Sequence, residues 1–314
     1  MVFQSNRSDR SPEKVADSGS GYKNGVKDRK KEGSGMRTVS SLFSISGLFF
    51  CLAFASSEAI SKNAPWRQVE NGLFIGEFAP LYEAPVKGSK IIILKINPAY
   101  YSFKLLCASE LGKIRLTPKE WCKKYNLVAA INAGMYQKDG LTNVGYMKNY
   151  SHLNNPRLNP TYKAVLAFNR MDFTVREIQI IDLKCQDFEK LKPKYQTFIQ
   201  SIRMIGCNQE NVWSQQDRRW SLAVLGVGKE GSVFFIFSEA PYSGYDFNNV
   251  LLSLDLSIFN AAYLEGGPEA GLYFSAGGME LEKVGIYGTG LNGSVVRSGA
   301  YPVPNVIGIV KKTR

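Results

Sequence analysis

The chain has very little histidine: His152 is the single copy in 314 residues. A Ser-His-Asp or Cys-His nucleophile system, or a zinc site with several histidines, would have to be built on that one residue. The sequence therefore argues against these classes, and we interpret His152 as an incidental loop residue. Carboxylates, amides, Lys and Arg side chains and backbone N–H groups remain, and they indicate acid/base or electrostatic catalysis on a polar substrate.

Signals of nucleic-acid recognition are also lacking, because the globular part has no basic run interleaved with aromatic residues and no known binding motif. The formal net charge is nevertheless +12, and residues 1–55 carry nine Lys/Arg against five Asp/Glu, so the remainder keeps a net charge of +8. A positive balance favours anionic partners. We therefore expect a phosphate-bearing glycan or an anionic lipid as the partner, and no nucleic acid.

Two N-terminal segments are not expected in the folded domain. Residues 1–35 are rich in Ser, Gly, Lys and Asp, which predicts a disordered extension and fits a start assigned too far upstream of Met36. Residues 36–55 have a basic start, a short apolar run and an Ala53-Phe54-Ala55 end, the pattern of a secretory signal peptide. We predict an exported protein, periplasmic or secreted, with no stable membrane span after cleavage; an uncleaved signal anchor is the alternative.

After cleavage, we expect a lead-in over residues 56–84 and one domain over residues 85–314. A content of 44% apolar and 12% aromatic residues predicts a packed core for a chain of this length. The four remaining cysteines permit three pairings, which the sequence leaves open together with the oligomeric state; they are Cys107, Cys122, Cys185 and Cys207.

Strand-like and helix-like segments alternate along the mature chain, which predicts an α+β fold. We expect a single domain with a mixed β-sheet core, a few flanking helices and strand ends that form the active-site cleft. The apolar segments 91–96 and 103–108 predict a hairpin. The further predicted strands are 127–131, 164–168, 177–181, 195–200, 223–227, 232–238, 261–264 and 306–310.

Two helices have start signals. Thr117 and Glu120 form a capping-box pattern with Pro118 at the first helical position, which predicts a helix to about Tyr125. Asp246 is predicted to cap an amphipathic helix over 247–256. The long segment 137–162, rich in Asn and Gly, is typical of a functional loop or lid, and 285–299 is predicted to be loops.

Two predicted strands end in turns of small residues. The strand 261–264 delivers Glu265 to the turn Gly266-Gly267-Pro268, and the strand 127–131 delivers Asn132 to the turn Ala133-Gly134. Polar residues at such strand ends are often catalytic, because a rigid sheet holds them beside a cleft. The alternative for Glu265 is a solvated carboxylate in a surface turn.

Arginines and aromatic residues near these turns suit a phosphorylated sugar. Arg203 and Arg219 can bind two phosphate oxygens at once, although each has the alternative of a surface ion pair, with Asp217 or another acid in the case of Arg219. Tyr136 and Tyr242 are predicted in turns where they could stack on a sugar, whereas Trp220 is more readily interpreted as core.

The order of motifs resembles the phosphodiester glycosidase family, whose best-known member is the lysosomal uncovering enzyme. The likeness covers about residues 85–311. Glu265 stands where better-known branches carry an aspartate, as in the Leu-Glu-Gly-Gly-Pro-Glu-Ala form of bacterial exported members. The motifs are Asn-Ala-Gly-Met-Tyr (132–136), Ser-x-Arg-Met (201–204), Arg-Trp-Ser (219–221), Ala-Pro-Tyr-Ser-x-x-Asp-Phe (240–247), Leu-Glu-Gly-Gly-Pro-Glu-Ala (264–270) and Pro-Asn-Val-Ile-Gly (304–308).

The resemblance implies an exported hydrolase that cleaves a sugar-1-phosphate diester on a cell-envelope or extracellular glycan. Glu265 would be the acid/base or nucleophile, Asn132 would hold a sugar hydroxyl or the attacking water, and Arg219 would bind phosphate. A divalent metal held by Glu265 and Asn132 is an option for which the sequence has no spaced ligand set. The turn glycines would offer backbone N–H donors to the substrate. Asp246 and Glu269 are candidate second carboxylates, although helix capping is the favoured role of Asp246. The further residues expected to bind substrate are Gly134, Tyr136, Arg203, Ser221, Tyr242, Asp246, Gly266, Gly267 and Glu269.

Two other functions stay open. The first is a non-catalytic envelope protein that binds an anionic glycan, but a binder has no need of the acid at Glu265 beside Asn132 and Arg219, so we favour the enzyme. The second is a polysaccharide or peptidoglycan hydrolase, which would depend little on the arginines.

Overall fold

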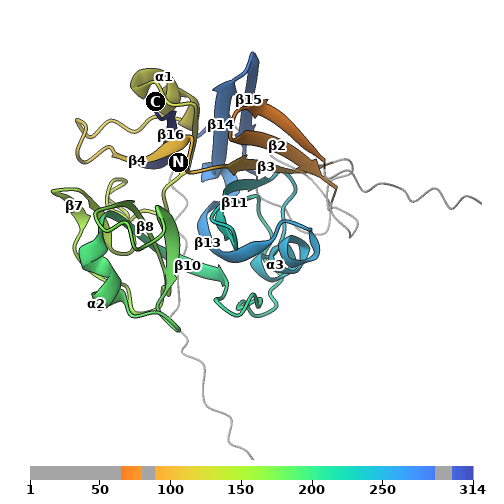
Figure 1. The fold of residues 1–314 in the computed structure, drawn as a ribbon. Helices are drawn as coiled ribbons and strands as arrows, with labels where there is room; N and C mark the ends of the chain where they lie inside the picture. Colours follow the sequence, from red (N-terminus) through yellow and green to blue (C-terminus); the bar gives the residue numbers. More distant parts are fainter. Residues whose placement is uncertain (1–64, 80–88, 287–298, 314) are drawn as a thin grey trace, which may run out of the picture. The chain divides into compact units, whose positions relative to one another are not determined.

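The computed structural model describes residues 65–79, 89–286 and 299–313 (Figure 1). Every described residue belongs to one compact unit, Ile60–Arg314. The extension predicted for 1–35 and the signal peptide predicted for 36–55 lie outside the described residues. No helix within the described ranges is both long enough and apolar enough to cross a membrane.

Most of this unit consists of two β-sheets, and the larger sheet has eleven strands. They are β1 (Trp66–Glu70), β2 (Leu73–Phe78), β3 (Ile91–Ile96), β6 (Met147–Asn149), β7 (His152–Asn155), β8 (Ala164–Arg170), β9 (Ile178–Asp182), β10 (Tyr195–Ile205), β11 (Leu222–Gly228), β12 (Val233–Ser238) and β13 (Ile258–Gly266). Neighbouring strands follow the order β1-β2-β3-β12-β11-β13-β10-β6-β7, and β8 pairs with both β10 and β9.

The smaller sheet has five strands in the order β15-β14-β5-β16-β4. These strands are β4 (Tyr101–Cys107), β5 (Ala129–Asn132), β14 (Gly271–Ala276), β15 (Met279–Val284) and β16 (Asn305–Lys311). The chain passes from the larger sheet to the smaller one directly after β13, through the single turn of 3₁₀ helix η2 (Gly267–Glu269). This passage contains the Glu265 motif.

The strand pairing corrects two predictions. All pairings between named strands of the described ranges are antiparallel, so the predicted mixed sheet is wrong. Short connections join antiparallel neighbours, whereas parallel neighbours need a long crossover. The predicted hairpin of 91–96 with 103–108 is also wrong, because β3 pairs with β2 and β12 while β4 pairs with β16 in the other sheet.

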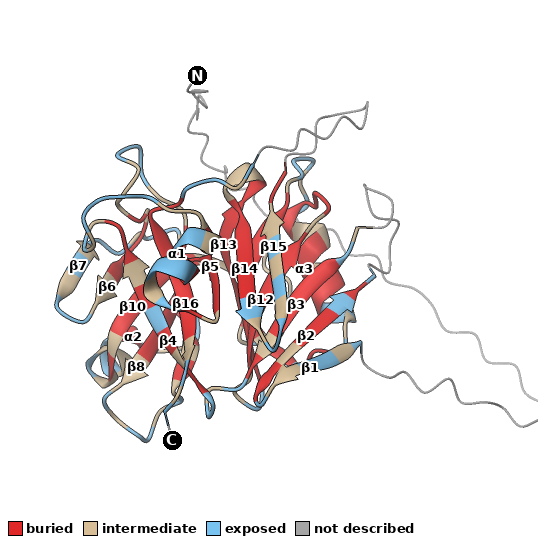
Figure 2. Ribbon diagram, turned by 90° about the horizontal axis from the view of Figure 1, so that it is seen from above, coloured by how far each residue is buried: buried red, intermediate tan, exposed pale blue. Residues whose placement is uncertain are grey.

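The main core lies between the two sheets (Figure 2). Strand β3 is largely apolar because both of its faces are buried. Ile92 and Leu94 point into this core, whereas Ile91 and Ile93 point to the opposite face of the sheet and pack there beneath a helix. Phe103 of the smaller sheet meets Phe235 of the larger one edge to face, with ring centroids 6.3 Å apart. Both sheets are therefore held at a fixed separation by interlocking side chains.

Helices cover the outer faces of both sheets. They are α1 (Pro118–Tyr125) on the smaller sheet and α2 (Phe188–Leu191) and α3 (Gly244–Ser253) on the larger one, and a 3₁₀ turn, η1 (Lys192–Lys194), follows α2. The capping box of α1 is confirmed, because Thr117 Oγ1 accepts from the Glu120 N–H at 3.2 Å and Glu120 Oε2 accepts from the Thr117 N–H at 2.8 Å.

The start of α3 is not where the sequence pattern predicted it. Ser243, not Asp246, is the cap, because its hydroxyl accepts from the Asp246 N–H at 3.0 Å. The helix begins three residues early, with Gly244 in its first turn, and ends at Ser253 instead of 256. Asp246 lies inside the first turn, where its charge still suits the helix dipole.

Two segments expected outside the sheets contribute strands. Strands β1 and β2 lie within 56–84, the predicted lead-in, and β2 pairs with β3 along its whole length. The segment 137–162 contains the hairpin β6–β7, and His152 begins β7, so it is not a loop residue. Strands of three and four residues with few apolar positions give no periodicity that a sequence pattern can detect.

Candidate active site

Glu265 reaches the space between the sheets because β13 contains a bulge. Tyr263 lies opposite Val224 of β11, whereas Glu265 lies opposite Ala223, which leaves Leu264 as the additional residue. Paired residues point to the same face of a sheet, and a bulge reverses the alternation beyond it. Since Ala223 packs in the core between the sheets, the Glu265 side chain is turned to that side.

The environment of Glu265 favours its protonated form. The residue is 5% exposed, and burial, followed by the negative charge of Glu269, raises the pKa of its carboxyl from 4.5 to about 8. The Gly266 N–H, which donates to Oε1 at 3.0 Å, acts in the opposite direction and is outweighed. Glu265 is therefore mostly protonated at pH 7 and is suited to donate a proton.

The turn after Glu265 depends on its two glycines. A Cβ on Gly266 would lie 2.2 Å from Cδ1 of Trp220, whose indole ring packs against the turn. Gly267 has a φ of +67°, and its N–H donates to the Ser221 carbonyl at 2.9 Å. The turn is thus fixed from the side of β11, with no room for a larger residue.

Asn132 fixes the same turn from the smaller sheet. Its side chain is buried; Nδ2 donates to the Glu269 carbonyl at 2.9 Å, and Oδ1 accepts from the Gly271 N–H at 2.8 Å. The structure thus brings Asn132 and the Glu265 turn together. Both polar ends of the amide are hydrogen-bonded to backbone, so Asn132 holds the turn in place, and its contact with a sugar hydroxyl or water stays a prediction.

Glu269 and Tyr136 lie close to Glu265. The Tyr136 hydroxyl interacts with the Glu269 carboxylate, and burial together with the charges of Glu269 and Glu265 raises the pKa of Tyr136. Tyr301 is close enough to contribute to the same shift. Sequence reasoning missed Tyr301, because it lies between the predicted loops of 285–299 and the motif 304–308 and belongs to neither.

Gly134 makes room for a buried amide that sequence reasoning also missed. Its φ is +117°, and a Cβ there would lie 2.8 Å from Oδ1 of Asn143. Asn143 is fully buried and its Nδ2 donates to the Gly145 carbonyl at 3.0 Å, but its Oδ1 has no hydrogen-bond partner in the described part of the chain. Buried polar atoms without a partner are rare. The only sequence signal for Asn143 is its place in the long Asn-rich segment.

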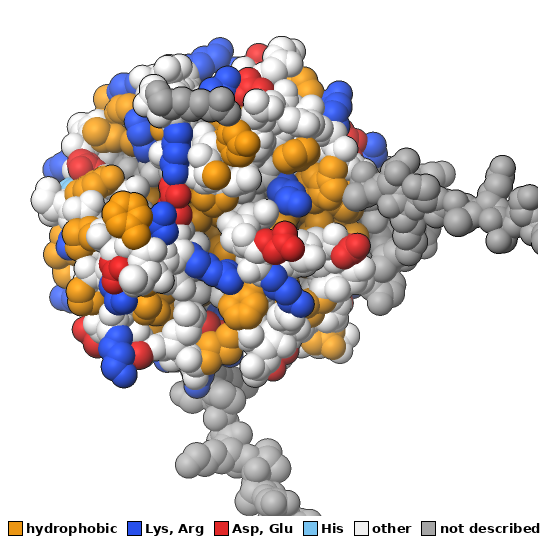
Figure 3. Space-filling view, viewed as in Figure 1, with side chains coloured by type: hydrophobic (Ala, Val, Ile, Leu, Met, Phe, Trp, Pro, Cys, Tyr) orange, Lys and Arg blue, Asp and Glu red, His pale blue; other side chains and the backbone are white. Residues whose placement is uncertain are grey.

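Of the two predicted phosphate-binding arginines, one is already engaged. Arg203 Nη1 donates to both carboxylate oxygens of the buried Asp182 at 3.0 Å. Arg203 therefore forms an ion pair, which was the alternative to the predicted phosphate contact. Arg219 has a half-exposed side chain, and its Nη2 lies 3.7 Å from Oδ2 of Asp246, a loose exposed pair that leaves its donors accessible. Lys and Arg side chains are scattered over the face shown in Figure 3, so the basic balance forms no continuous patch on that face.

Two further predicted contacts are corrected. Tyr242 is buried in the core beneath α3, with its ring 5.6 Å from that of Phe247, so it does not lie where a sugar could stack. The Ser221 hydroxyl is buried, donates to the Glu239 carbonyl at 3.1 Å and accepts from the Ile286 N–H at 3.0 Å. Tyr242 was predicted from its place in a turn and Ser221 from the Arg-Trp-Ser motif, and both residues instead support the scaffold of the Glu265 turn.

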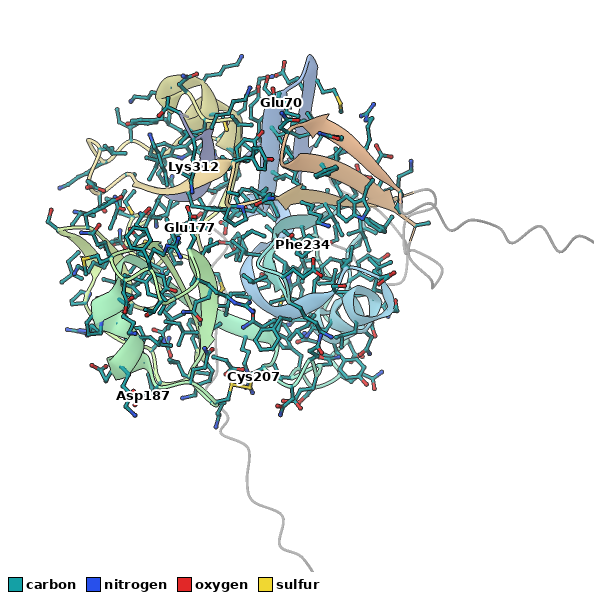
Figure 4. The ribbon with its side chains drawn as sticks, viewed as in Figure 1. Glu70, Glu177, Asp187, Cys207, Phe234 and Lys312 are labelled. Atoms are coloured by element: carbon teal, nitrogen blue, oxygen red, sulfur yellow. A yellow bond between two sulfur atoms is a disulfide. The ribbon has the colours of Figure 1, made fainter. Side chains whose placement is uncertain are left out.

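The cysteine pairing that the sequence left open is visible in the structure. Cys185 and Cys207 form a disulfide, while Cys107 and Cys122 are free and buried (Figure 4). The disulfide lies beside Asp182, whose Oδ2 accepts from the Cys207 N–H at 3.1 Å. It ties the end of β10 to the segment after β9.

Potential metal ligands converge at two places in the described ranges, and neither includes Glu265. One is Asp182 with Cys185 and Cys207, whose sulfurs are joined in the disulfide. The other is Cys107, Glu110 and His152. The predicted option of a divalent ion on Glu265 and Asn132 has no support in this geometry, because the Asn132 oxygen is hydrogen-bonded to Gly271.

Comparison with known proteins gives one family. The model of the phosphodiester glycosidase family matches residues 125–310, more than half of the chain. The fold is similar to the catalytic domain of zebrafish N-acetylglucosamine-1-phosphodiester alpha-N-acetylglucosaminidase, auto-inhibited by its pro-peptide, at 13% identity and a TM-score of 0.51 over 76% of this chain and 82% of that one. It is also similar to a hypothetical protein from Synechocystis, at 13% identity and a TM-score of 0.50 over 77% of this chain and 62% of that one. No curated protein sequence matches the chain.

Proposed function

Because the chain belongs to the phosphodiester glycosidase family, we propose that it is an exported hydrolase that cleaves a sugar-1-phosphate diester on a cell-envelope or extracellular glycan. The observation that carries the proposal is the buried Glu265 with its pKa raised to about 8 beside the charge of Glu269. Two neighbouring carboxyl groups, one protonated and one ionised, are the pair that glycoside hydrolysis requires.

The two carboxyl groups divide the reaction between them. Glu265 donates its proton to the phosphate oxygen as the bond between C1 of the sugar and that oxygen breaks. Water forms the new bond to C1 and gives a proton to the Glu269 carboxylate, so the products are a free sugar and a phosphate monoester. Proton exchange with solvent then restores both groups.

Neighbouring residues support these roles. Tyr136 orients the Glu269 carboxylate through its hydroxyl, and Asn132 holds the turn that carries both acids. Arg219 binds the phosphate, because its guanidinium is half-exposed and only loosely paired with Asp246.

Export is supported by the disulfide between Cys185 and Cys207. Such bonds persist in the periplasm or outside the cell and are rare in the reducing cytosol. Together with the signal-peptide pattern of residues 36–55, the disulfide supports the proposal of a substrate in the envelope or beyond it.

The experiment that tests the proposal measures free sugar and phosphate monoester released from a panel of sugar-1-phosphodiesters. We expect activity from the wild-type protein, a loss of about 10²- to 10⁴-fold in kcat for Glu265→Gln, and partial recovery in Glu265→Asp. Arg219→Gln is expected to lose roughly 10- to 100-fold in kcat/KM, whereas its exposed neighbour Arg218 serves as the matched control in Arg218→Gln.

Two outcomes would overturn the proposal. Glycan binding by the wild type and by Glu265→Gln alike, with no sugar released, would identify a non-catalytic binding protein. Equal rates on phosphate-free glycosides, unaffected by Arg219→Gln, would identify a glycan hydrolase without phosphate specificity.

A further inference from the structure

The single histidine of the chain lies beside a free cysteine and a glutamate. Cys107 ends β4, Glu110 lies in the turn that follows, and His152 begins β7. One potential ligand atom from each of these residues lies within 4.8 Å of the other two. Because β4 belongs to the smaller sheet and β7 to the larger, the three side chains join the two sheets, and Glu265 is not among them.

The surrounding residues hold these groups in place. Ser109 Oγ lies 2.9 Å from His152 Nε2 and accepts from Asn154 Nδ2 at 2.9 Å. In the tautomer with its proton on Nε2, His152 donates to Ser109 Oγ, and Nδ1 then keeps its lone pair for an ion. Asn149 Nδ2 donates to Glu110 Oε2 at 2.9 Å, which orients that carboxylate while leaving its second oxygen available. Hydrogen bonds of this kind fix the orientation of ligands in metal sites.

The three ligand types favour zinc. Thiolate, imidazole and carboxylate together are the ligands of zinc, and three protein ligands leave a fourth position for water. A second sulfur, Met147 Sδ, lies 3.8 Å from Cys107 Sγ on the buried side. Cys107 is fully buried and Glu110 is exposed. The soft sulfur ligand therefore lies on the inside and the hard carboxylate ligand at the surface, from which an ion can enter.

We propose that Cys107, Glu110 and His152 form a zinc site that clamps the edge of the smaller sheet to the larger one. Zinc bonds of about 2.0 to 2.3 Å put tetrahedral ligand atoms roughly 3.5 Å apart, so ligand atoms up to 4.8 Å apart need to approach by about 1.3 Å at most. Side-chain rotation of the exposed Glu110 and the half-buried His152 supplies that movement. This site is independent of the proposed hydrolase activity.

The test uses the whole purified protein, freed of metal with a chelator and titrated with Zn²⁺ against a chromophoric competitor. We expect one Zn²⁺ per chain, and Co²⁺ in its place is expected to show the near-ultraviolet absorption of a cobalt–thiolate bond. His152→Gln and Glu110→Gln, both at accessible positions, are each expected to weaken Zn²⁺ binding at least about 10-fold, with His152→Gln the larger loss.

The matched control is Cys122, the other free buried cysteine, which lies in α1. Cys107→Ser is expected to remove the cobalt–thiolate absorption and Cys122→Ser to retain it. Binding of Zn²⁺ by His152→Gln and Glu110→Gln with wild-type affinity would overturn the site, and so would the absence of any thiolate absorption in the wild type.

Discussion

Replacing Glu265 by Gln removes one proton-binding site whose effect on stability can be worked out from the fold. The carboxyl group has an ordinary pKa of 4.5 when the chain is unfolded and about 8 in the folded protein. Between these values the folded protein binds more protons than the unfolded chain, so the free energy of unfolding falls as the pH rises from about 4.5 to about 8. Below 4.5 the effect vanishes, since both forms are protonated.

The size of the effect follows from the same two values. A pKa difference of one unit corresponds to about 1.4 kcal/mol, so Glu265 destabilises the fold by about 5 kcal/mol at alkaline pH relative to pH 4.5, as an upper limit. Gln is nearly the same size and does not titrate, so the variant lacks this pH-dependent loss of unfolding free energy. We expect the wild type to lose several kcal/mol more stability than Glu265→Gln between pH 5 and pH 8.

The assay is urea unfolding at a series of pH values, with the slope of stability against pH compared between the two proteins. Glu230→Gln is the matched control, because Glu230 is an exposed carboxylate. Parallel slopes for the wild type and Glu265→Gln would refute the reasoning, since they would mean that Glu265 is ionised in the fold at neutral pH.

Three further predictions concern the neighbours of Glu265 and the disulfide. Glu269→Gln removes the charge that helps to raise the pKa of Glu265, so the Glu265 titration, followed by carbon NMR of the carboxyl group, is expected to move to lower pH; an unchanged midpoint would mean that burial alone sets it. Asn132→Ala removes both hydrogen bonds to the 269–271 backbone and is expected to lower the free energy of unfolding by about 2 to 4 kcal/mol, measured in urea; a loss under about 0.5 kcal/mol would contradict the positioning role. Cys185→Ser opens a loop with a sequence separation of 22 and is expected to cost roughly 3 kcal/mol, and a reducing agent should destabilise the wild type but not this variant.

Local sequence predicted those features that local physics decides. The capping box at Thr117 and Glu120 needs only neighbouring residues, and the small-residue turn after Glu265 needs only its glycines. The apolar strands that were predicted lie close to their observed positions, whereas β2 and β14 were not predicted. The partners of the predicted strands were not found either, because the segment 91–96 gives the same pattern whether it pairs with the next strand or with β2 and β12.

The candidate site residues also divide into those that local sequence indicates and those that depend on distant partners. Glu265 and Asn132 were found because strand ends in tight turns are visible in the sequence, whereas the engagement of Arg203 depends on Asp182, a partner 21 residues away. Whether Tyr242 faces a sugar or the core depends on where α3 packs, which no local pattern contains. Asn143 was missed because its position beside Gly134 arises only when the segment 137–162 folds back.

The bulge at Leu264 has a consequence for how the candidate site tolerates substitutions in the core. It turns Glu265 inward from the larger sheet, while Asn132 of the smaller sheet holds the backbone of Glu269. Both acids lie on the turn that connects the two sheets, so the packing of the hydrophobic layer between the sheets sets where that turn is held. A conservative substitution at Phe103 or Phe235, whose rings meet in that layer, is therefore expected to lower the turnover proposed for this chain.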